Sequence, residues 1–261
     1  MEAIKVMQLD VAYDEKYIIK NMNLAIPKGK MTMIIGANGC GKSTLLKSIA
    51  RIITPKKGDI QLNGVSLRQQ APKEIAKKMA VLPQSPSVPS GLLVKELVSY
   101  GRFPYQRALG GLKQQDIDLI NWAMRVTGIF EFADRPVDSL SGGQRQRAFI
   151  AMALVQDTEI LVLDEPTTYL DMAHQLEILL LLQKLNKEEK RTIVMVLHEL
   201  NNATKFADYL VGVKDGKIVF SGPPLEVITK DHLRTLYGIE ATLQLDESKK
   251  YPICVDFNIK E

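Results

Sequence analysis

Three things are scarce in this sequence: cysteine, long hydrophobic runs and any excess of charge of one sign. Its 261 residues include only two cysteines, Cys40 and Cys254. Two are too few for a disulfide framework, which agrees with a reducing compartment. The longest uninterrupted apolar stretches, such as Ile178 to Leu182, fall far short of the roughly 20 residues that cross a bilayer. The N-terminus also lacks the pattern of a signal peptide, so we expect a cytosolic chain that does not itself span a membrane.

The charge balance argues against a nucleic-acid partner. Lysine and arginine number 34 and aspartate and glutamate 30, and the two signs are interspersed without a dominant basic block. With 46% hydrophobic residues the chain can bury a full core. Its length fits one large α/β domain that carries an inserted subdomain.

Hydrophobic periodicity outlines the order of the elements. The first 30 residues predict antiparallel strands at 4–12 and 18–26, and a mostly helical insert runs from Leu93 to about Asp157. Further expected elements are strands at 30–35, 159–163 and 192–197, helices at 113–127, 144–155 and 174–186, a hairpin turning at Asp215-Gly216, and a tail with helices through Tyr237 and a hairpin of 242–245 with 253–257.

The segment 36–44, GANGCGKST, fits the pattern G-x-x-x-x-G-K-[ST]. It follows an apolar run and precedes a helical pattern, which is the order that a phosphate-binding loop requires. The candidate ATP ligands are Gly36, Asn38, Gly39, Cys40, Gly41, Lys42, Ser43 and Thr44. Glycines let backbone N–H groups approach phosphate oxygens, Lys42 reaches the β- and γ-oxygens, and the Ser43 hydroxyl ligates Mg²⁺.

Two further segments narrow the class of protein. LSGGQ at 140–144 starts 104 residues after Gly36, and the apolar strand 160–163 ends at Asp164-Glu165. Asp164 is placed to hold Mg²⁺ through its water shell, and Glu165 is the candidate general base that polarises water. Gln84 ends another strand, where its amide can touch both the metal and the attacking water.

Together these segments and His198 resemble an ATP-binding cassette (ABC) ATPase over nearly the whole chain. The resemblance implies an α/β fold: a P-loop NTPase (RecA-like) core with an N-terminal antiparallel β portion and an inserted α-helical signature subdomain. We expect the nucleotide-binding core at 1–88 and 158–223, the signature subdomain at 89–157 and a C-terminal extension at 224–261.

The same resemblance assigns roles that the residues alone do not. His198 matches the switch histidine that contacts the γ-phosphate, and Tyr13 matches the aromatic that stacks on adenine, with Tyr17 the other candidate. Asp171 matches the loop that crosses between subunits. The signature residues Leu140, Ser141, Gly142, Gly143 and Gln144 would close over the ATP of a second copy, which implies a head-to-tail homodimer with two ATP molecules between the chains.

The stretch from Pro86 to Tyr105 lies where the family docks a short helix of a membrane subunit. Gly101 to Tyr105, GRFPY, resembles importers of iron-siderophore, haem and cobalamin complexes, and Thr167 to Gln175, which contains Tyr169, narrows the resemblance toward siderophore members. Leu92-Leu93-Val94 departs from the threonine-valine pair frequent there. The resemblance implies two polytopic permease subunits, an extracytoplasmic substrate-binding protein, and a peripheral position at the cytoplasmic face of the cell membrane.

Three alternatives remain open at this stage. The same machinery could serve haem or cobalamin import, or act without a permease on ribosomes, DNA or a cluster-assembly scaffold. DNA-repair members carry a long coiled coil that is absent here. A P-loop kinase is the third, but it leaves residues 140–144, Asp171 and His198 without roles.

Overall fold

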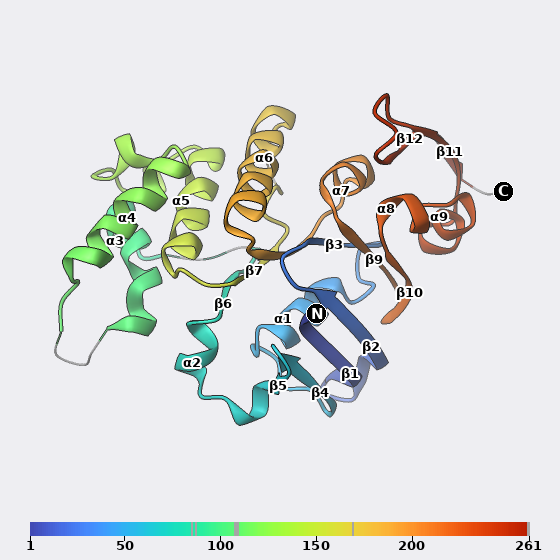
Figure 1. Ribbon diagram of the computed structural model, residues 1–261, viewed down its shortest axis with the longest axis horizontal. Coiled ribbons are helices and arrows are strands. Elements are labelled where there is room, and N and C mark those ends of the chain that lie inside the picture. The colour runs from blue at the N-terminus through green and yellow to red at the C-terminus, as the bar shows by residue number, and fades with distance from the viewer. Residues whose placement is uncertain (85, 87, 107–109, 169, 260–261) are drawn as a thin grey trace. The chain divides into compact units, whose positions relative to one another are not determined.

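The computed structural model describes residues 1–84, 86, 88–106, 110–168 and 170–259 (Figure 1). Tyr169, part of the predicted siderophore motif, lies outside these residues. The chain forms two compact units, one of Met1–Gln70 with Thr192–Glu261 and one of Ala71–Arg191. The finer division predicted at 89–157 and 224–261 stays a prediction.

The first unit contains the antiparallel sheet that the sequence predicts. Its strands are β1 (Glu2–Tyr13), β2 (Lys16–Pro27), β4 (Lys57–Leu62) and β5 (Val65–Ser66), in the order β2-β1-β4-β5. The β1–β2 hairpin turns at Asp14, whose φ of 53° is left-handed. Sequence reasoning missed both β4, where Lys57, Gly58 and Asp59 weaken the strand pattern, and β5, which has only two residues.

A second sheet of the same unit carries the phosphate loop. Its strands within this unit are β3 (Met31–Ile35), β8 (Thr192–Val196), β9 (Tyr209–Lys214) and β10 (Lys217–Gly222). β3 pairs in parallel with β8 on one side and β9 on the other, and every residue of β3 and β8 is buried. β9 and β10 form the predicted hairpin, with φ of 48° at Asp215 and 70° at Gly216.

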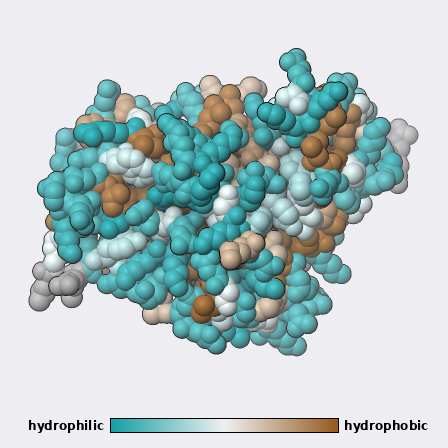
Figure 2. All heavy atoms as spheres, viewed as in Figure 1, coloured by the Kyte–Doolittle hydropathy of each residue, from teal (hydrophilic) through white to brown (hydrophobic). Residues whose placement is uncertain are grey.

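The remaining elements of this unit include the C-terminal segment. They are α1 (Lys42–Ile49), η1 (Leu67–Gln69), α7 (Leu200–Phe206), α8 (Pro224–Val227), α9 (Lys230–Tyr237) and the hairpin of β11 (Ile239–Leu245) with β12 (Pro252–Ile259). The tail helices and hairpin are thus where the sequence predicts them. Figure 2 shows hydrophobic surface over this hairpin, where Leu245, Val255 and Phe257 are exposed.

The second unit joins two parallel strands to a group of helices. β6 (Met79–Leu82) pairs in parallel with β7 (Ile160–Asp164). The helices are α2 (Pro72–Ala76), α3 (Val94–Ser99), η2 (Tyr100–Tyr105), α4 (Gln114–Val126), η3 (Phe130–Phe132), η4 (Val137–Ser139), α5 (Gly142–Val155) and α6 (Met172–Glu189). α5 packs against both α3 and α4 in the green and yellow part of the chain (Figure 1). The described residues between Leu93 and Asp157 are mostly helical, as the sequence predicts.

A buried ion pair holds these helices together. Arg102 donates from Nε to Asp116 Oδ1 at 2.7 Å and from Nη1 to the Val155 carbonyl at 3.0 Å. A Cβ at Gly101 would lie 2.1 Å from the Met152 carbonyl oxygen, so only glycine fits there. The Gly-Arg pair of the importer-like motif therefore fastens η2 to α4 and to the end of α5. No helix among the described residues is long and apolar enough to cross a membrane.

Candidate functional site

The phosphate loop follows β3 directly and ends at the first turn of α1. Lys42 is buried, and its Nζ donates to the carbonyl oxygens of Gly36 at 2.8 Å and Ala37 at 2.9 Å. Gly41 precedes the helix with a left-handed φ of 108°, a conformation that disfavours a side chain. The loop is therefore wound around the lysine that the sequence assigns to the phosphates.

Segments distant in the sequence pack against this loop. A Cβ at Gly36, whose φ is 149°, would lie 2.1 Å from the Val213 carbonyl oxygen at the end of β9. The Gly216 N–H donates to the Cys40 carbonyl at 2.9 Å. A Cβ at Gly216 would lie 1.9 Å from the Ile18 carbonyl oxygen on β2. The β9–β10 turn is thus packed between the loop and β2.

Cys40 is a buried free cysteine that packs within the loop. Burial raises the pKa of its thiol, and the nearby charge of Lys42 only partly opposes that rise. A thiol with a raised pKa stays protonated near neutral pH and is a poor nucleophile.

His198 reaches the loop's edge of the sheet because of strand register. Ile34 of β3 pairs with Val196 of β8, and the Leu197 N–H donates to the Ile34 carbonyl at 3.2 Å. Gly36 and His198 each follow two residues after that pair. The parallel register therefore brings the predicted switch histidine to the strand end from which the phosphate loop starts.

The two candidate adenine-stacking residues lie on the hairpin of β1 and β2. Tyr13 and Tyr17 are both about half exposed. Lys20 Nζ lies 5.3 Å from the Tyr17 ring centroid, so one face of that ring already carries a cation. Tyr13 carries no such contact among the described residues, and its role stays a prediction.

A second group of predicted residues assembles in the other unit through the same register. Leu82 of β6 pairs with Leu163 of β7, and two residues later the Gln84 amide donates to Glu165 Oε2 at 2.5 Å. Thr168 Oγ1 donates to the same oxygen at 3.1 Å. Glu165 is buried and has a φ of 53°, a strained value for a side-chain-bearing residue.

Asp164 ends β7 and is buried. Its neighbour Glu165 is held by Gln84 and Thr168, and Thr168 is a participant that sequence reasoning missed. The spacing of a threonine three residues after the acid is the signal that could have found it. Two carboxylates at one strand end, with one held by an amide and a hydroxyl, suit the orientation of metal-bound and attacking water.

The signature residues form the N-terminus of α5. Ser141 Oγ accepts from the Gln144 N–H at 3.3 Å, and Gln144 Oε1 accepts from the Ser141 N–H at 3.1 Å. This reciprocal pair is a capping box. Gly142 has open space around its Cα, whereas Leu140 is half-buried. The serine and glutamine thus fix the helix start, and the positive end of the helix dipole lies at exposed Gly142.

Asp171 is joined to the signature helix through a histidine that sequence reasoning gave no role. Asp171 caps α6, and its Oδ2 lies 2.8 Å from His174 Nδ1. Hydrogen bonds from the His174 backbone and ring lower the pKa of Asp171. A Cβ at Gly143 would lie 3.2 Å from the His174 ring, so the ring packs against the signature glycine.

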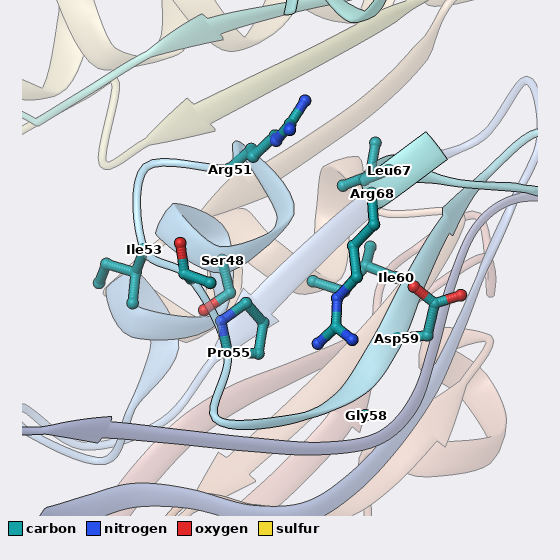
Figure 3. A pocket seen from close by; sticks show the side chains of 10 residues that line it. Ser48, Arg51, Ile53, Pro55, Gly58, Asp59, Ile60, Leu67 and Arg68 are labelled. Atoms are coloured by element: carbon teal, nitrogen blue, oxygen red, sulfur yellow. The ribbon is translucent and has the colours of Figure 1, made fainter. Parts of the chain in front are cut away.

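A pocket of about 210 Å³ lies elsewhere on the first unit (Figure 3). It is lined by Ser48, Arg51, Ile53, Thr54, Pro55, Gly58, Asp59, Ile60, Leu67 and Arg68. Figure 3 shows the Arg68 side chain extending into the space between Pro55 and Asp59. None of the predicted site residues lines it, so it is separate from the phosphate loop.

A glycine loop between a buried strand and a helix, wound around a buried lysine in an α/β fold, defines the class of P-loop nucleotide-binding proteins. The pattern that describes the ABC transporter family matches residues 19–168. The chain therefore belongs to the ABC transporter family, and it is an ATPase of that family.

Individual relatives agree over almost the full length. The chain is 50% identical over 259 residues to the iron(3+)-hydroxamate import ATP-binding protein FhuC of Bacillus subtilis (strain 168), covering 99% of this chain and 96% of that protein. An inward-facing ABC transporter assigned to the metal-chelate type matches with a TM-score of 0.84 at 28% identity, covering 98% and 96%. The dimeric bacterial cassette MJ0796 matches with a TM-score of 0.75 at 29% identity, covering 84% and 98%.

Proposed function

We propose that this chain is the ATP-hydrolysing subunit of a membrane importer of ferric-siderophore complexes. The observation that carries the hydrolytic part is the hydrogen bond from Gln84 to Glu165, which orients the candidate base. The cargo rests on similarity to FhuC, an iron(3+)-hydroxamate import protein, over almost the whole chain.

Phosphate binding falls to the loop around Lys42. Its N–H groups and the N-terminal dipole of α1 attract the phosphate oxygens, and Thr44 supports the α-phosphate side. Ser43, the Gln84 amide oxygen and Asp164, the last through water, would hold Mg²⁺. Hydroxyl, amide and carboxylate oxygens fit that ion, which keeps several waters and also binds substrate phosphates. When bound, Mg²⁺ neutralises charge on the β- and γ-phosphates.

Water activation falls to Glu165. Its carboxylate accepts a proton from the water that attacks the γ-phosphate. Gln84 and Thr168 both donate to Oε2, which fixes the orientation of the carboxylate. His198, at the strand end beside the phosphate loop, contacts the γ-phosphate.

A second copy completes the nucleotide site. The exposed start of α5 offers the N–H groups of Gly142 and Gly143 and the Ser141 hydroxyl to an anion. The nucleotide of the same chain is already bound by the phosphate loop around Lys42, so we assign this anion to the ATP of the second copy. MJ0796, a cassette of the same family, is dimeric. ATP-bound chains therefore pack head to tail, with Asp171 crossing toward the partner.

The permease docks on the surface around α3 and η2. Tyr100 and Phe103 are 52% and 74% exposed, three residues apart, on either side of buried Arg102. Large exposed aromatic side chains on a rigid base are typical of protein interfaces. Two polytopic permease subunits would hold the ATPase dimer at the cytoplasmic face of the membrane, and an extracytoplasmic binding protein would deliver the chelate.

Co-purification from membranes tests this proposal. The tagged chain should recover a polytopic membrane subunit, and Phe103→Ser should lose it while keeping ATPase activity of the isolated chain. Lys187→Ser, an exposed change on α6, is the matched control that should retain the subunit. Recovery of the chain with ribosomes or DNA instead would refute the transport role. The cargo is tested separately by uptake in cells that lack the chain: if adding it back restores uptake of haem or cobalamin alone, the iron cargo is refuted.

A further inference from the structure

His174, in the first turn of α6, contacts two segments that the proposed dimer brings against the second copy. The first is Asp171. The His174 backbone N–H donates to Asp171 Oδ1 at 2.9 Å, and the ring Nδ1 lies 2.8 Å from Oδ2. An ionised carboxylate has acceptors only, so Nδ1 carries the proton of the second hydrogen bond. The histidine therefore holds both oxygens of the Asp171 carboxylate.

The second segment is the start of α5, against which the same ring packs. A Cβ at Gly143 would lie 3.2 Å from Cδ2, 3.4 Å from Cγ and 3.6 Å from Nε2 of His174. Gly143 is buried, whereas Ser141 and Gly142 just before it are exposed. The ring thus contacts the signature helix at a buried glycine, while the neighbouring residues that would face an anion stay open to solvent.

Side chains, more than close backbone packing, join α5 to α6 among the described residues. α5 packs closely against α3 and α4 and much less closely against α6. Apart from the His174 ring on Gly143, Arg147 on α5 forms an ion pair with Glu177 on α6. That pair lies about one turn further along each helix. The contact of His174 is therefore the one that connects the starts of the two helices.

The exposure of the Asp171–His174 pair separates its function from stability. The two side chains are 65% and 47% exposed. An ion pair or hydrogen bond at such an exposed position adds little to the free energy of unfolding. Asp171 also caps α6 through the backbone N–H of His174, which any residue at that position retains. A chain without the ring should therefore still fold.

We propose that His174 is a positioning residue that fixes Asp171 and the signature residues of one chain relative to each other. The two segments would then meet the second copy as a single surface. Their contact restricts their relative motion before the chains meet, so less conformational freedom is lost when the ATP-bound dimer forms. This inference rests on the head-to-tail dimer of the proposed function.

The test measures the dissociation constant of the ATP-bound dimer by analytical ultracentrifugation at saturating Mg²⁺-ATP. Every variant is made in the Glu165→Gln chain, whose slow turnover preserves the ATP-bound state. His174→Ala should raise the dimer dissociation constant about tenfold, the equivalent of about 1.4 kcal/mol, because the two segments must then be aligned on association. The affinity of the monomer for Mg²⁺-ATP should stay within about twofold, since the phosphate loop is not touched.

Two further variants each keep one of the two contacts. His174→Phe keeps a ring beside Gly143 but has no donor for Asp171. His174→Asn keeps a donor near the position of Nδ1 but has no ring. Because the link needs both contacts, each variant should weaken the dimer at least about threefold. An unweakened dimer in either of them would overturn the proposal.

Glu177→Ala is the matched control, because it removes the other side-chain contact between the same two helices. It should change the dimer dissociation constant by less than about twofold, since the Glu177 side chain is 54% exposed. An equal loss in Glu177→Ala and His174→Ala would show a general loosening of the helices and overturn the positioning role. A parallel loss of ATP affinity in the His174→Ala monomer would overturn it as well.

The parent chain separates the two levels of inference. If Glu165→Gln alone forms no ATP-dependent dimer, the dimer of the proposed function is refuted together with this inference. A dimer that forms in the parent and is unaffected by His174→Ala refutes the positioning role alone.

Discussion

At the scale of single residues, strand register decides which side chains meet. Gln84 and Glu165 each come two residues after a paired position of parallel strands, and so do Gly36 and His198. One spacing rule thus places four predicted residues at strand ends. The contacts that sequence reasoning missed, Thr168 to Glu165 among them, are side-chain hydrogen bonds that depend on rotamers rather than on register.

Gly36→Ala should destabilise the chain by about 2–4 kcal/mol, because its Cβ would meet a backbone oxygen that cannot rotate away. Urea unfolding measures the change. Gly142→Ala is the control: it has an ordinary φ and no atom near its Cβ, so its stability should change by less than about 0.5 kcal/mol. Equal effects at both positions would contradict the packing of Gly36 on Val213.

At the scale of elements, two ion pairs that join different helices and loops, Arg102–Asp116 and Lys95–Asp134, differ in how far they are buried. Arg102 and Asp116 are nearly buried, whereas Lys95 and Asp134 are 50% and 79% exposed. A pair cut off from solvent leaves an uncompensated charge when one partner is removed, and an exposed pair does not. The stability of the packing around η2 should therefore depend on Arg102 far more than the stability of the packing around α3 depends on Lys95.

Arg102→Ala should lower the free energy of unfolding by about 3–5 kcal/mol and Lys95→Ala by less than about 1 kcal/mol. Urea unfolding of the two variants measures both losses of free energy. A loss of permease binding in Arg102→Ala without any loss of stability would show that the arginine acts in docking rather than in holding the helices.

The stability of the hairpin of β11 and β12 should depend on pH through the Asp246 carboxyl. Burial works to raise the pKa of this carboxyl, but hydrogen bonds from the Ser248 hydroxyl and from the backbone N–H groups of Tyr251, Lys250 and Ser248 outweigh it and lower the pKa to about 2. Because the folded pKa lies below the ordinary value of about 3.9, the stabilisation is fully present above about pH 4 and is lost as the pH falls toward 2.

Hydrogen exchange at the Tyr251 amide measures this effect. Its protection should fall between about pH 4 and pH 2 after normalisation for intrinsic exchange, and Asp246→Asn should remove the pH dependence. Glu247→Gln, the neighbouring change, should leave it in place. An unchanged profile in Asp246→Asn would assign the turn to another group.

Much of the architecture was readable from the sequence at this scale. The strand before Gly36, the helix after it, the Asp215-Gly216 hairpin and the tail hairpin all follow from periodicity and turn residues. The role of His174 was not, because it comes from a contact with Gly143, which is distant in the sequence. The motif around Arg102 was recognised, but its buried pairing with Asp116 required the folded helices.

At the scale of the whole molecule, hydrolysis and dimer formation are predicted to be separable. Glu165→Gln removes the base but leaves the phosphate loop and the signature helix intact. ATP binding should persist, turnover should fall by about 10²–10⁴-fold, and ATP should trap a dimer. Phosphate release and analytical ultracentrifugation measure the two outcomes. Glu188→Gln, an exposed change on α6, should hydrolyse at the normal rate.

The same background tests the role of the signature residues. Ser141→Arg added to Glu165→Gln should abolish the trapped dimer without weakening the affinity of the monomer for ATP. Weaker monomer binding would mean that the serine contacts the chain's own nucleotide.

The packing of the phosphate loop on Val213 and Gly216 also has a consequence for synthesis of the chain. Gly216 leaves the ribosome 180 residues after Gly36. At translation rates of about 5–20 residues per second this delay is about 10–40 s. During that time the nascent loop lacks the strand turn against which it folds. Nascent chains stalled before Val213 should therefore fail to retain nucleotide, although they already display the complete motif.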